Sequence, residues 1–161
     1  MPTLKDLRFR SLYIFGYISG YIDGEGCFNV SFSKRKKIKI GWETKPSFSV
    51  SQNEDRAQIL YLMKDIFDCG FLRRDYSDKT LKYEIRSLND LINKVIPFFN
   101  KYPLISKKKK EFESFRQICF LMKKGEHLST KGFRRIIKIA FKMNPSGKRK
   151  YSLKEILKSL R

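Results

Sequence analysis

Residues 18–26 read ISGYIDGEG and close an apolar segment of helical length, SLYIFGYISGYID, which spans residues 11–23. Because this segment is apolar almost all round, it predicts a helix buried on several sides, with Ser11 as a possible N-cap. Gly16 and Gly20 are four residues apart, and a small serine precedes Gly20. One face of the helix therefore has almost no side chains, and another backbone can approach it closely.

Two acidic residues, Asp23 and Glu25, stand at the C-terminal end of this predicted helix. The helix dipole disfavours negative charge there, so the placement costs stability unless a positive group, such as a metal ion, lies nearby. The spacing equally fits a solvated acidic turn in which Glu25 pairs with a lysine. The spacing by itself leaves both interpretations open.

The pattern changes period directly after the motif. Apolar residues alternate with polar ones over 28–33 and again over 47–51, which predicts two strands with one dry and one polar face. The basic segment 34–39 lies between them and predicts the connection.

The remaining elements follow from periodicity and capping residues. They are a helix over 54–67, strands over 71–76 and 81–86 joined by a polar turn at 77–80, helices over 87–100, 106–124 and 129–143, a break at 144–147, and a last helix from 152. Pro97 predicts a kink or an early helix end. The order predicts an α+β fold with an antiparallel four-stranded sheet, in which residues 1–128 form the core and 129–161 a helical extension of the same domain.

Composition limits the class of protein. The chain has 161 residues, of which 41% are hydrophobic, so it can fold as one domain. Its formal net charge of +20 predicts a polyanionic partner. With no long apolar run and no apolar leader, we expect a soluble intracellular protein and no membrane partner. The widely spaced Cys27, Cys69 and Cys119 predict buried free thiols.

The stretch ISGYIDGEG resembles the LAGLIDADG motif of homing endonucleases, with Ser19-Gly20 at its small pair and residues 23–26 at its acidic end. The order of elements continues the resemblance to about Ile118, and the tail MNPSGKRKYSLKEIL resembles that of single-motif, intron-encoded members. The resemblance implies a saddle-shaped sheet over DNA, with helices on its other face and two motif helices packed at a two-fold axis.

The chain contains one motif and no internal repeat, so the resemblance implies a homodimer that reads a near-palindromic site. The interface it implies consists of Gly16, Ser19, Gly20 and Asp23. Asp23 is expected to cap or orient the helix end, with a direct catalytic role as the alternative.

By resemblance, Glu25 is the essential catalytic carboxylate and binds Mg²⁺, with the Gly24 carbonyl as a further ligand. Hard oxygen donors suit this ion, and other divalent cations such as Mn²⁺ or Ca²⁺ can bind the same donors. Glutamate replaces the aspartate of the motif and makes the carboxylate one methylene longer.

Three further catalytic residues are implied by weaker matches. Gln52 matches a polar residue that orders water, although it also fits a simple helix-entry position. Arg56 matches a basic residue that supports the solvent network, with ordinary surface charge as the alternative. Lys107 matches a lysine at the scissile region, but four consecutive lysines leave the register open and Lys108 fits nearly as well.

The polar strand faces are expected to contact DNA, where arginine favours guanine and serine is permissive. A merely solvated sheet face is the alternative for each residue. The candidates are Asn29, Ser31, Ser33, Arg35, Lys45, Ser47, Ser49, Arg73, Asp75, Lys82, Glu84, Arg86 and Lys108.

These observations favour a site-specific, Mg²⁺-dependent endonuclease that cuts double-stranded DNA. An intron RNA maturase, with intron RNA as partner, or a DNA-binding regulator without catalysis is the main alternative. A basic ribosome-associated protein explains the charge but not the motif. The cytoplasm, the chloroplast and the mitochondrion are all possible compartments.

Overall fold

The computed structural model describes residues 4–76, 79–143 and 147–160. Its centre is an antiparallel four-stranded sheet with the strand order β1-β2-β4-β3. The strands are β1 (Gly26–Lys34), β2 (Trp42–Asn53), β3 (Phe71–Asp75) and β4 (Thr80–Ile85). This confirms the predicted α+β class. The predicted turn at 77–80 and the break at 144–147 lie partly outside the described residues.

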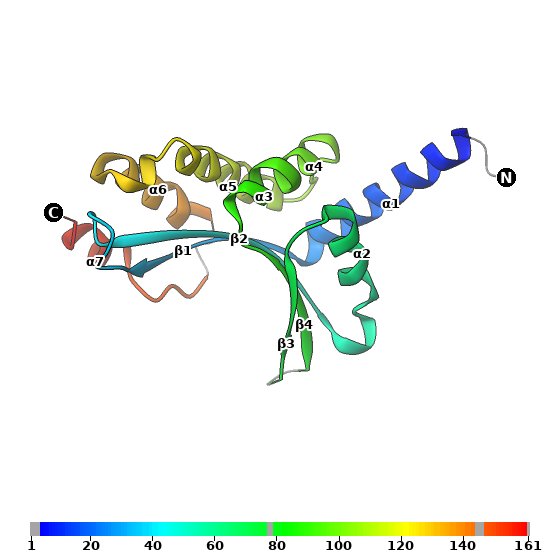
Figure 1. The fold of residues 1–161 in the computed structure, drawn as a ribbon, viewed down its shortest axis with the longest axis horizontal. Helices are drawn as coiled ribbons and strands as arrows, with labels where there is room; N and C mark the ends of the chain where they lie inside the picture. Colours follow the sequence, from blue (N-terminus) through cyan, green and yellow to red (C-terminus); the bar gives the residue numbers. More distant parts are fainter. Residues whose placement is uncertain (1–3, 77–78, 144–146, 161) are drawn as a thin grey trace.

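Helices cover one face of this sheet. They are α1 (Leu4–Glu25), η1 (Glu54–Arg56), α2 (Gln58–Phe67), α3 (Leu88–Asp90), η2 (Leu91–Val95), α4 (Ile96–Lys101), α5 (Lys108–Lys123), η3 (Glu126–Leu128), α6 (Thr130–Met143) and α7 (Leu153–Lys158). In Figure 1, α3 to α6 lie above the sheet, β3 and β4 curve downward, and α1 extends away from the body of the molecule. No helix of the described ranges is long and apolar enough to cross a bilayer.

The period-two pattern of the strands gives the sheet its two faces. Phe28 and Phe48 pair across β1 and β2, and both are fully buried under the helices. The Phe28 ring lies 5.3 Å, between centroids, from the rings of both Phe112 and Phe115 of α5. The same alternation places Cys27 on the polar face, where it is exposed, so the prediction that all three thiols are buried is wrong.

The motif helix is longer and less buried than its sequence predicts. It begins at Leu4 instead of near Ser11, because residues 4–10 contain no glycine or proline to stop it. Among residues 10–25 of this helix, Ile18 and Ile22 near the C-terminal end are fully buried, whereas Tyr13 is 70% exposed. The expectation of burial on several sides is therefore not met within this chain.

Pro97 shapes the helix over residues 88–101 without ending it. The amide of Ile96 donates to the Leu91 carbonyl, the five-residue step of a π turn, and helical structure continues to Lys101. Proline has no amide hydrogen and its ring crowds the preceding turn, and the wider π turn lies directly before it. Of the two predicted effects of Pro97, an early helix end does not occur, and a π turn lies where a kink was expected.

The C-terminal segment is fixed to the edge strand β1. The Arg149 guanidinium donates to the carbonyls of Val30 at 2.7 Å and Ala140 at 2.6 Å, and it lies 4.6 Å from the Phe141 ring centroid. Burial lowers the pKa of Arg149. These contacts occupy a free carbonyl of the sheet edge and join residues of the predicted 129–161 extension to the core.

Gly132, in the first turn of α6, provides a test of this packing. A Cβ at this position would lie 2.2 Å from the Glu126 carbonyl oxygen. Alanine favours a helix over glycine by about 1 kcal/mol, but the clash with rigid backbone costs about 1–3 kcal/mol. We expect Gly132→Ala to lower the free energy of unfolding in urea, whereas Lys131→Ala, at its exposed neighbour, changes it by less than about 0.5 kcal/mol. Equal midpoints for the two variants would show that α6 can shift freely.

Candidate functional site

The site is built at the corner where α1 passes directly into β1. Glu25 is the last residue of α1 and is exposed, and Gly26 is the first residue of β1 and is buried. A Cβ at Gly26 would lie 2.7 Å from the Ile22 carbonyl oxygen, so only glycine permits so close a return of the chain. The corner therefore holds Glu25 in a fixed place beside the polar face of the sheet.

Asp23 ties this corner to the loop before α5. Its carboxylate accepts hydrogen bonds from the Ile105 amide at 3.2 Å, the Ser106 amide at 2.9 Å and the Ser106 hydroxyl at 2.7 Å. Burial raises the pKa of Asp23, but the bonds from Ser106 and Ile105 outweigh it and hold the pKa below its usual range. These contacts are what a residue that orients the end of α1 would make, which is one of the two predicted alternatives for Asp23.

This tether gives a prediction for pH. Ionised Asp23 stabilises the fold above its unfolded pKa of about 3.9, and the contribution disappears as the pH falls through the lower folded pKa. We expect Asp23→Asn to cost about 1 kcal/mol at neutral pH, the usual net value of such bonds. Urea unfolding of both proteins from pH 7 to pH 3 should show the difference shrinking only below about pH 4. A pH-independent difference would contradict the assignment.

Gln52 lies beside the motif because of the strand register. Gly26 pairs with Val50, so Gln52, two residues further along β2, lies level with the last turn of α1. Its Nε2 donates to the Tyr21 hydroxyl of α1, and its Oε1 accepts from the Asn53 amide at 2.8 Å. Tyr21, which the sequence did not single out, therefore orients Gln52.

Of the two predicted lysines, Lys108 contacts the corner from the start of α5. The Lys108 ammonium donates to the Gly26 carbonyl at 2.6 Å, immediately beside Glu25, and its side chain is only 16% exposed. Lys107 is exposed. The geometry favours Lys108 as the lysine of the site. Arg56 lies on the exposed η1 turn, where its Nε is 3.8 Å from Asp55.

The four predicted interface residues, Gly16, Ser19, Gly20 and Asp23, all line one groove of about 380 Å³. Ser19 is buried there and donates to the Tyr102 carbonyl at 2.8 Å. A Cβ at Gly16 or Gly20 would meet nothing within 4 Å. Their face is therefore open to a partner.

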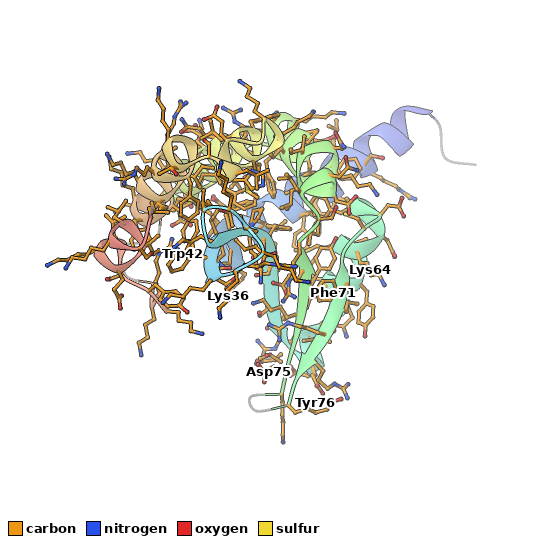
Figure 2. The ribbon with its side chains drawn as sticks, turned by 60° about the vertical axis from the view of Figure 1, so that its left-hand side comes forward. Lys36, Trp42, Lys64, Phe71, Asp75 and Tyr76 are labelled. Atoms are coloured by element: carbon orange, nitrogen blue, oxygen red, sulfur yellow. The ribbon has the colours of Figure 1, made fainter. Side chains whose placement is uncertain are left out.

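The polar face of the sheet carries most of the predicted DNA contacts. Asn29 faces Ser47 and Ser31 faces Lys45 across β1 and β2, and Arg73 faces Lys82 across β3 and β4. A groove of about 680 Å³ borders this face, where Asn29, Lys45, Glu84 and Arg86 line it together with Leu88 and Met122 from the helices. Figure 2 shows Lys36 in the loop between β1 and β2, and Asp75 and Tyr76 at the lower tip of the β3–β4 hairpin.

The acidic residues of this face hold its cations in place. Glu84 is 5% exposed and lies 3.4 Å from the Arg73 Nε and 2.9 Å from an Arg86 nitrogen. Burial raises the pKa of Glu84, but Arg86, Lys82 and Arg73 outweigh this effect and lower it. We therefore read Glu84 as a positioner of arginines more than as a base contact.

Three other predicted contacts are less accessible or engaged elsewhere. Ser47 and Ser49 are 9% and 4% exposed on the central strand. Arg35 lies just beyond β1 and forms an ion pair with Glu43 at 2.6 Å. Ser33 and Asp75 keep intermediate exposure at the strand ends. Cys27 and Ser51 also lie on this face. They were not among the predicted DNA contacts, although the period-two alternation of the strands indicates their position.

The residues at the corner offer accessible oxygen atoms that suit a divalent metal ion. Glu25 is exposed, and Gly24 lies in the last turn of α1, whose final carbonyls have no amide partner further along the helix. Carboxylate and carbonyl oxygens are the donors that Mg²⁺ prefers. Within the described residues no three His, Cys, Asp or Glu side chains form a closed cage. A divalent ion held here would take its remaining ligands from groups other than these side chains.

Comparison with known proteins places this arrangement in a family. The model of the LAGLIDADG endonuclease family matches residues 18–119. The homing endonuclease I-ApeII of Aeropyrum pernix is 31% identical over 149 residues, which cover 89% of this chain and 87% of that protein. The "Probable intron-encoded endonuclease 2" of Neurospora crassa is 31% identical over 80% of this chain, which spans only 28% of that longer protein.

A solved structure agrees over nearly the whole fold. The archaeal intron-encoded homing endonuclease I-Vdi141I, in complex with DNA, has a TM-score of 0.85 and 32% identity, over 92% of this chain and 95% of that one. The region that the family model matches, residues 18–119, contains the C-terminal end of α1 with the motif, all four strands and most of α5. The chain belongs to the LAGLIDADG endonuclease family.

Proposed function

We propose that the protein is a homodimeric, site-specific endonuclease that cuts a long, near-palindromic DNA target by Mg²⁺-dependent phosphodiester hydrolysis. The observation that carries the proposal is the fixed, exposed Glu25 beside a basic, polar sheet face. A protein that only binds DNA gains nothing from an unpaired carboxylate close to phosphates. The intracellular compartment, cytoplasm or organelle, is then the one that holds the target DNA.

Affinity and specificity come from different groups on the sheet. A net charge of +20 supplies sequence-independent attraction to phosphates. Sequence information is carried by the edges of the bases. Arg73 and Arg86, which Glu84 holds, offer hydrogen-bond donors to these edges, and so does the side-chain amide of Asn29. Because Glu84 is buried under both arginines, their positions are set before DNA binds.

At the corner, each residue has a separate task. Glu25 and the Gly24 carbonyl would hold the divalent ion, which when bound supplies charge stabilisation and a more acidic water. Gln52, oriented by Tyr21, offers a polar group at the same level and can order a water. Lys108 brings a positive charge to the Gly26 carbonyl and can contact a phosphate at the corner.

The two lysines give a prediction with a built-in control. Lys108→Ala removes the ammonium at the corner, and we expect the cleavage rate to fall about tenfold to a hundredfold with a small loss of DNA affinity. Lys107→Ala makes the same change of charge one residue earlier, and its rate should stay within about twofold. Single-turnover cleavage of the same duplex measures both, and the reverse order would restore Lys107 as the site lysine.

The proposal as a whole is tested by the products of cleavage. The protein is incubated with a duplex library and Mg²⁺, and the ends of cut molecules are sequenced. One long site with near two-fold symmetry supports the endonuclease and the homodimer together. Tight binding of DNA or intron RNA without cutting would instead favour the regulator or maturase.

A further inference from the structure

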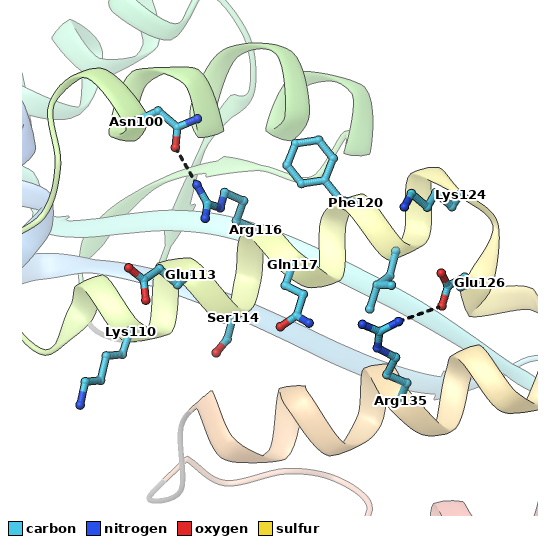
Figure 3. A pocket seen from close by; sticks show the side chains of 11 residues that line it. Asn100, Lys110, Glu113, Ser114, Arg116, Gln117, Phe120, Lys124, Glu126 and Arg135 are labelled. Atoms are coloured by element: carbon cyan, nitrogen blue, oxygen red, sulfur yellow. Dashed lines mark hydrogen bonds and ion pairs between the residues drawn. The ribbon is translucent and has the colours of Figure 1, made fainter.

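A long groove on the helical side of the molecule has no part in the proposed DNA cleavage. It follows the outward face of α5 and has a volume of about 820 Å³, with the end of α4 on one side and η3 and α6 on the other (Figure 3). The inward face of α5 packs on the sheet through Phe112 and Phe115. The groove therefore lies on the side of the molecule opposite the polar face of the sheet.

Positive charge predominates around this groove. Lys110, Arg116, Lys124 and Arg135 line it, against two carboxylates, Glu113 and Glu126. One of these acids, Glu126, is partly neutralised because it lies 3.9 Å from Arg135.

The neighbouring helix α6 adds to this charge. Its sequence, TKGFRRIIKIAFKM, has five basic residues and no acidic one, and the basic side chains are all exposed. A polyanion is the complementary partner for such a surface.

An aromatic ring stands in the middle of these cations. Phe120 is 41% exposed, although most of the phenylalanines are buried or half-buried. Figure 3 shows its ring between Arg116 and Lys124 on α5. Exposed rings beside cations stack unpaired bases, whereas the bases of a duplex are already stacked and cannot reach such a ring.

We propose that this groove binds a single-stranded nucleic acid, with one base stacked on Phe120 and phosphates near Lys124, Arg116 and Arg135. Lys110 and Lys124 are fourteen positions apart on α5, about 21 Å at the rise of a helix, so the groove accepts several nucleotides. Since the groove and the sheet are on opposite sides, single strand and target duplex bind at the same time.

The test uses two matched pairs of variants. A labelled single strand of about ten nucleotides, within known site sizes, is titrated by anisotropy with full-length protein already saturated with unlabelled duplex and without divalent ions. We expect Phe120→Ala to weaken binding about tenfold, the scale of one lost stack. Leu128→Ala, which removes an exposed apolar side chain outside the groove, should have no effect.

The second pair tests the charge. Lys124 lines the groove and Lys123 does not. We expect Lys124→Ala to lower the slope of log affinity against log salt by about 0.7, the value for one phosphate of a single strand, and Lys123→Ala to leave it unchanged. RNA and DNA oligonucleotides are compared in parallel, and tighter RNA binding identifies a transcript as the ligand.

Two results would overturn the proposal. One is complete displacement of the oligonucleotide by duplex DNA, because the oligonucleotide would then bind to the sheet and not to the groove. The other is unchanged binding by Phe120→Ala. These variants should cut duplex DNA as fast as the wild type. If the wild type itself does not cut duplex DNA, the proposed endonuclease function is refuted, but the proposal of a single-strand site in the groove still stands.

Discussion

Glu25→Gln should abolish DNA cleavage while leaving DNA binding as tight as in the wild type, or tighter. The amide keeps the shape of the side chain but removes the charge that would hold a divalent ion at the corner. Glu25 is exposed and makes no ion pair in the described protomer, so the change costs the fold little. It also removes one negative charge near the phosphates, which favours binding. We expect the rate to fall by about 10² to 10³-fold or more.

The matched control for this variant is Glu113→Gln. Glu113 is also an exposed glutamate, but it lies on the outward face of α5, away from the polar face of the sheet. Its neutralisation should leave duplex cleavage unchanged. Single-turnover cleavage and equilibrium binding are measured on one duplex for all three proteins. Cutting by Glu25→Gln at a rate near that of the wild type would show that another group carries the reaction.

The strands were predictable because their alternation is local. Polar and apolar residues alternate along β1, so the face of each residue follows from its position alone. The order β1-β2-β4-β3 does not follow from this pattern, because β4 pairs with β2 between residues that are 27 to 37 positions apart, such as Asn53 with Thr80 and Phe48 with Ile85. Which polar residues stay accessible depends on that order: Ser49, on a central strand, is covered, and Ser31, on the edge, is exposed.

The corner could be recognised from sequence, but its supporting contacts could not. The motif marks Glu25, whereas the partners of Asp23 lie more than eighty residues later, in a loop that periodicity does not describe. The contact of Lys108 depends on the same loop, because Ser106, which bonds to Asp23, lies just before the turn from which Lys108 donates to the Gly26 carbonyl. Four identical lysines carry no information about which of them faces inward.

The exposed part of α1 is a case in which the sequence predicts more burial than the single chain shows. The sequence predicts a helix buried on several sides, yet Tyr13 and Tyr17 are 70% and 51% exposed in the protomer. Apolar side chains around an open glycine face are typical of a surface that another protein covers. The apolar pattern of α1 thus reflects contacts in an assembly as well as contacts within the single chain. We propose that a second copy of α1 covers this surface.

Gly20→Leu should convert the protein into a folded monomer that does not cut both strands of DNA. A Cβ at Gly20 meets nothing within 4 Å, so the protomer accepts the side chain, and leucine favours a helix over glycine by roughly 1 kcal/mol. Two motif helices that approach through their glycines cannot accept it, because the added atoms hold the backbones apart. Lys64→Leu places the same side chain on the exposed surface of α2 and should change neither assembly nor cleavage.

Light scattering separates the possible results. The wild type and Lys64→Leu should have twice the chain mass of 19.2 kDa, and Gly20→Leu should have that mass itself with an unchanged circular dichroism spectrum. Since each protomer brings a single Glu25, the monomer lacks the second carboxylate that a double-strand cut requires. A dimeric Gly20→Leu that cuts normally would move the interface away from α1. Loss of the folded state would show instead that the glycine is needed within the protomer.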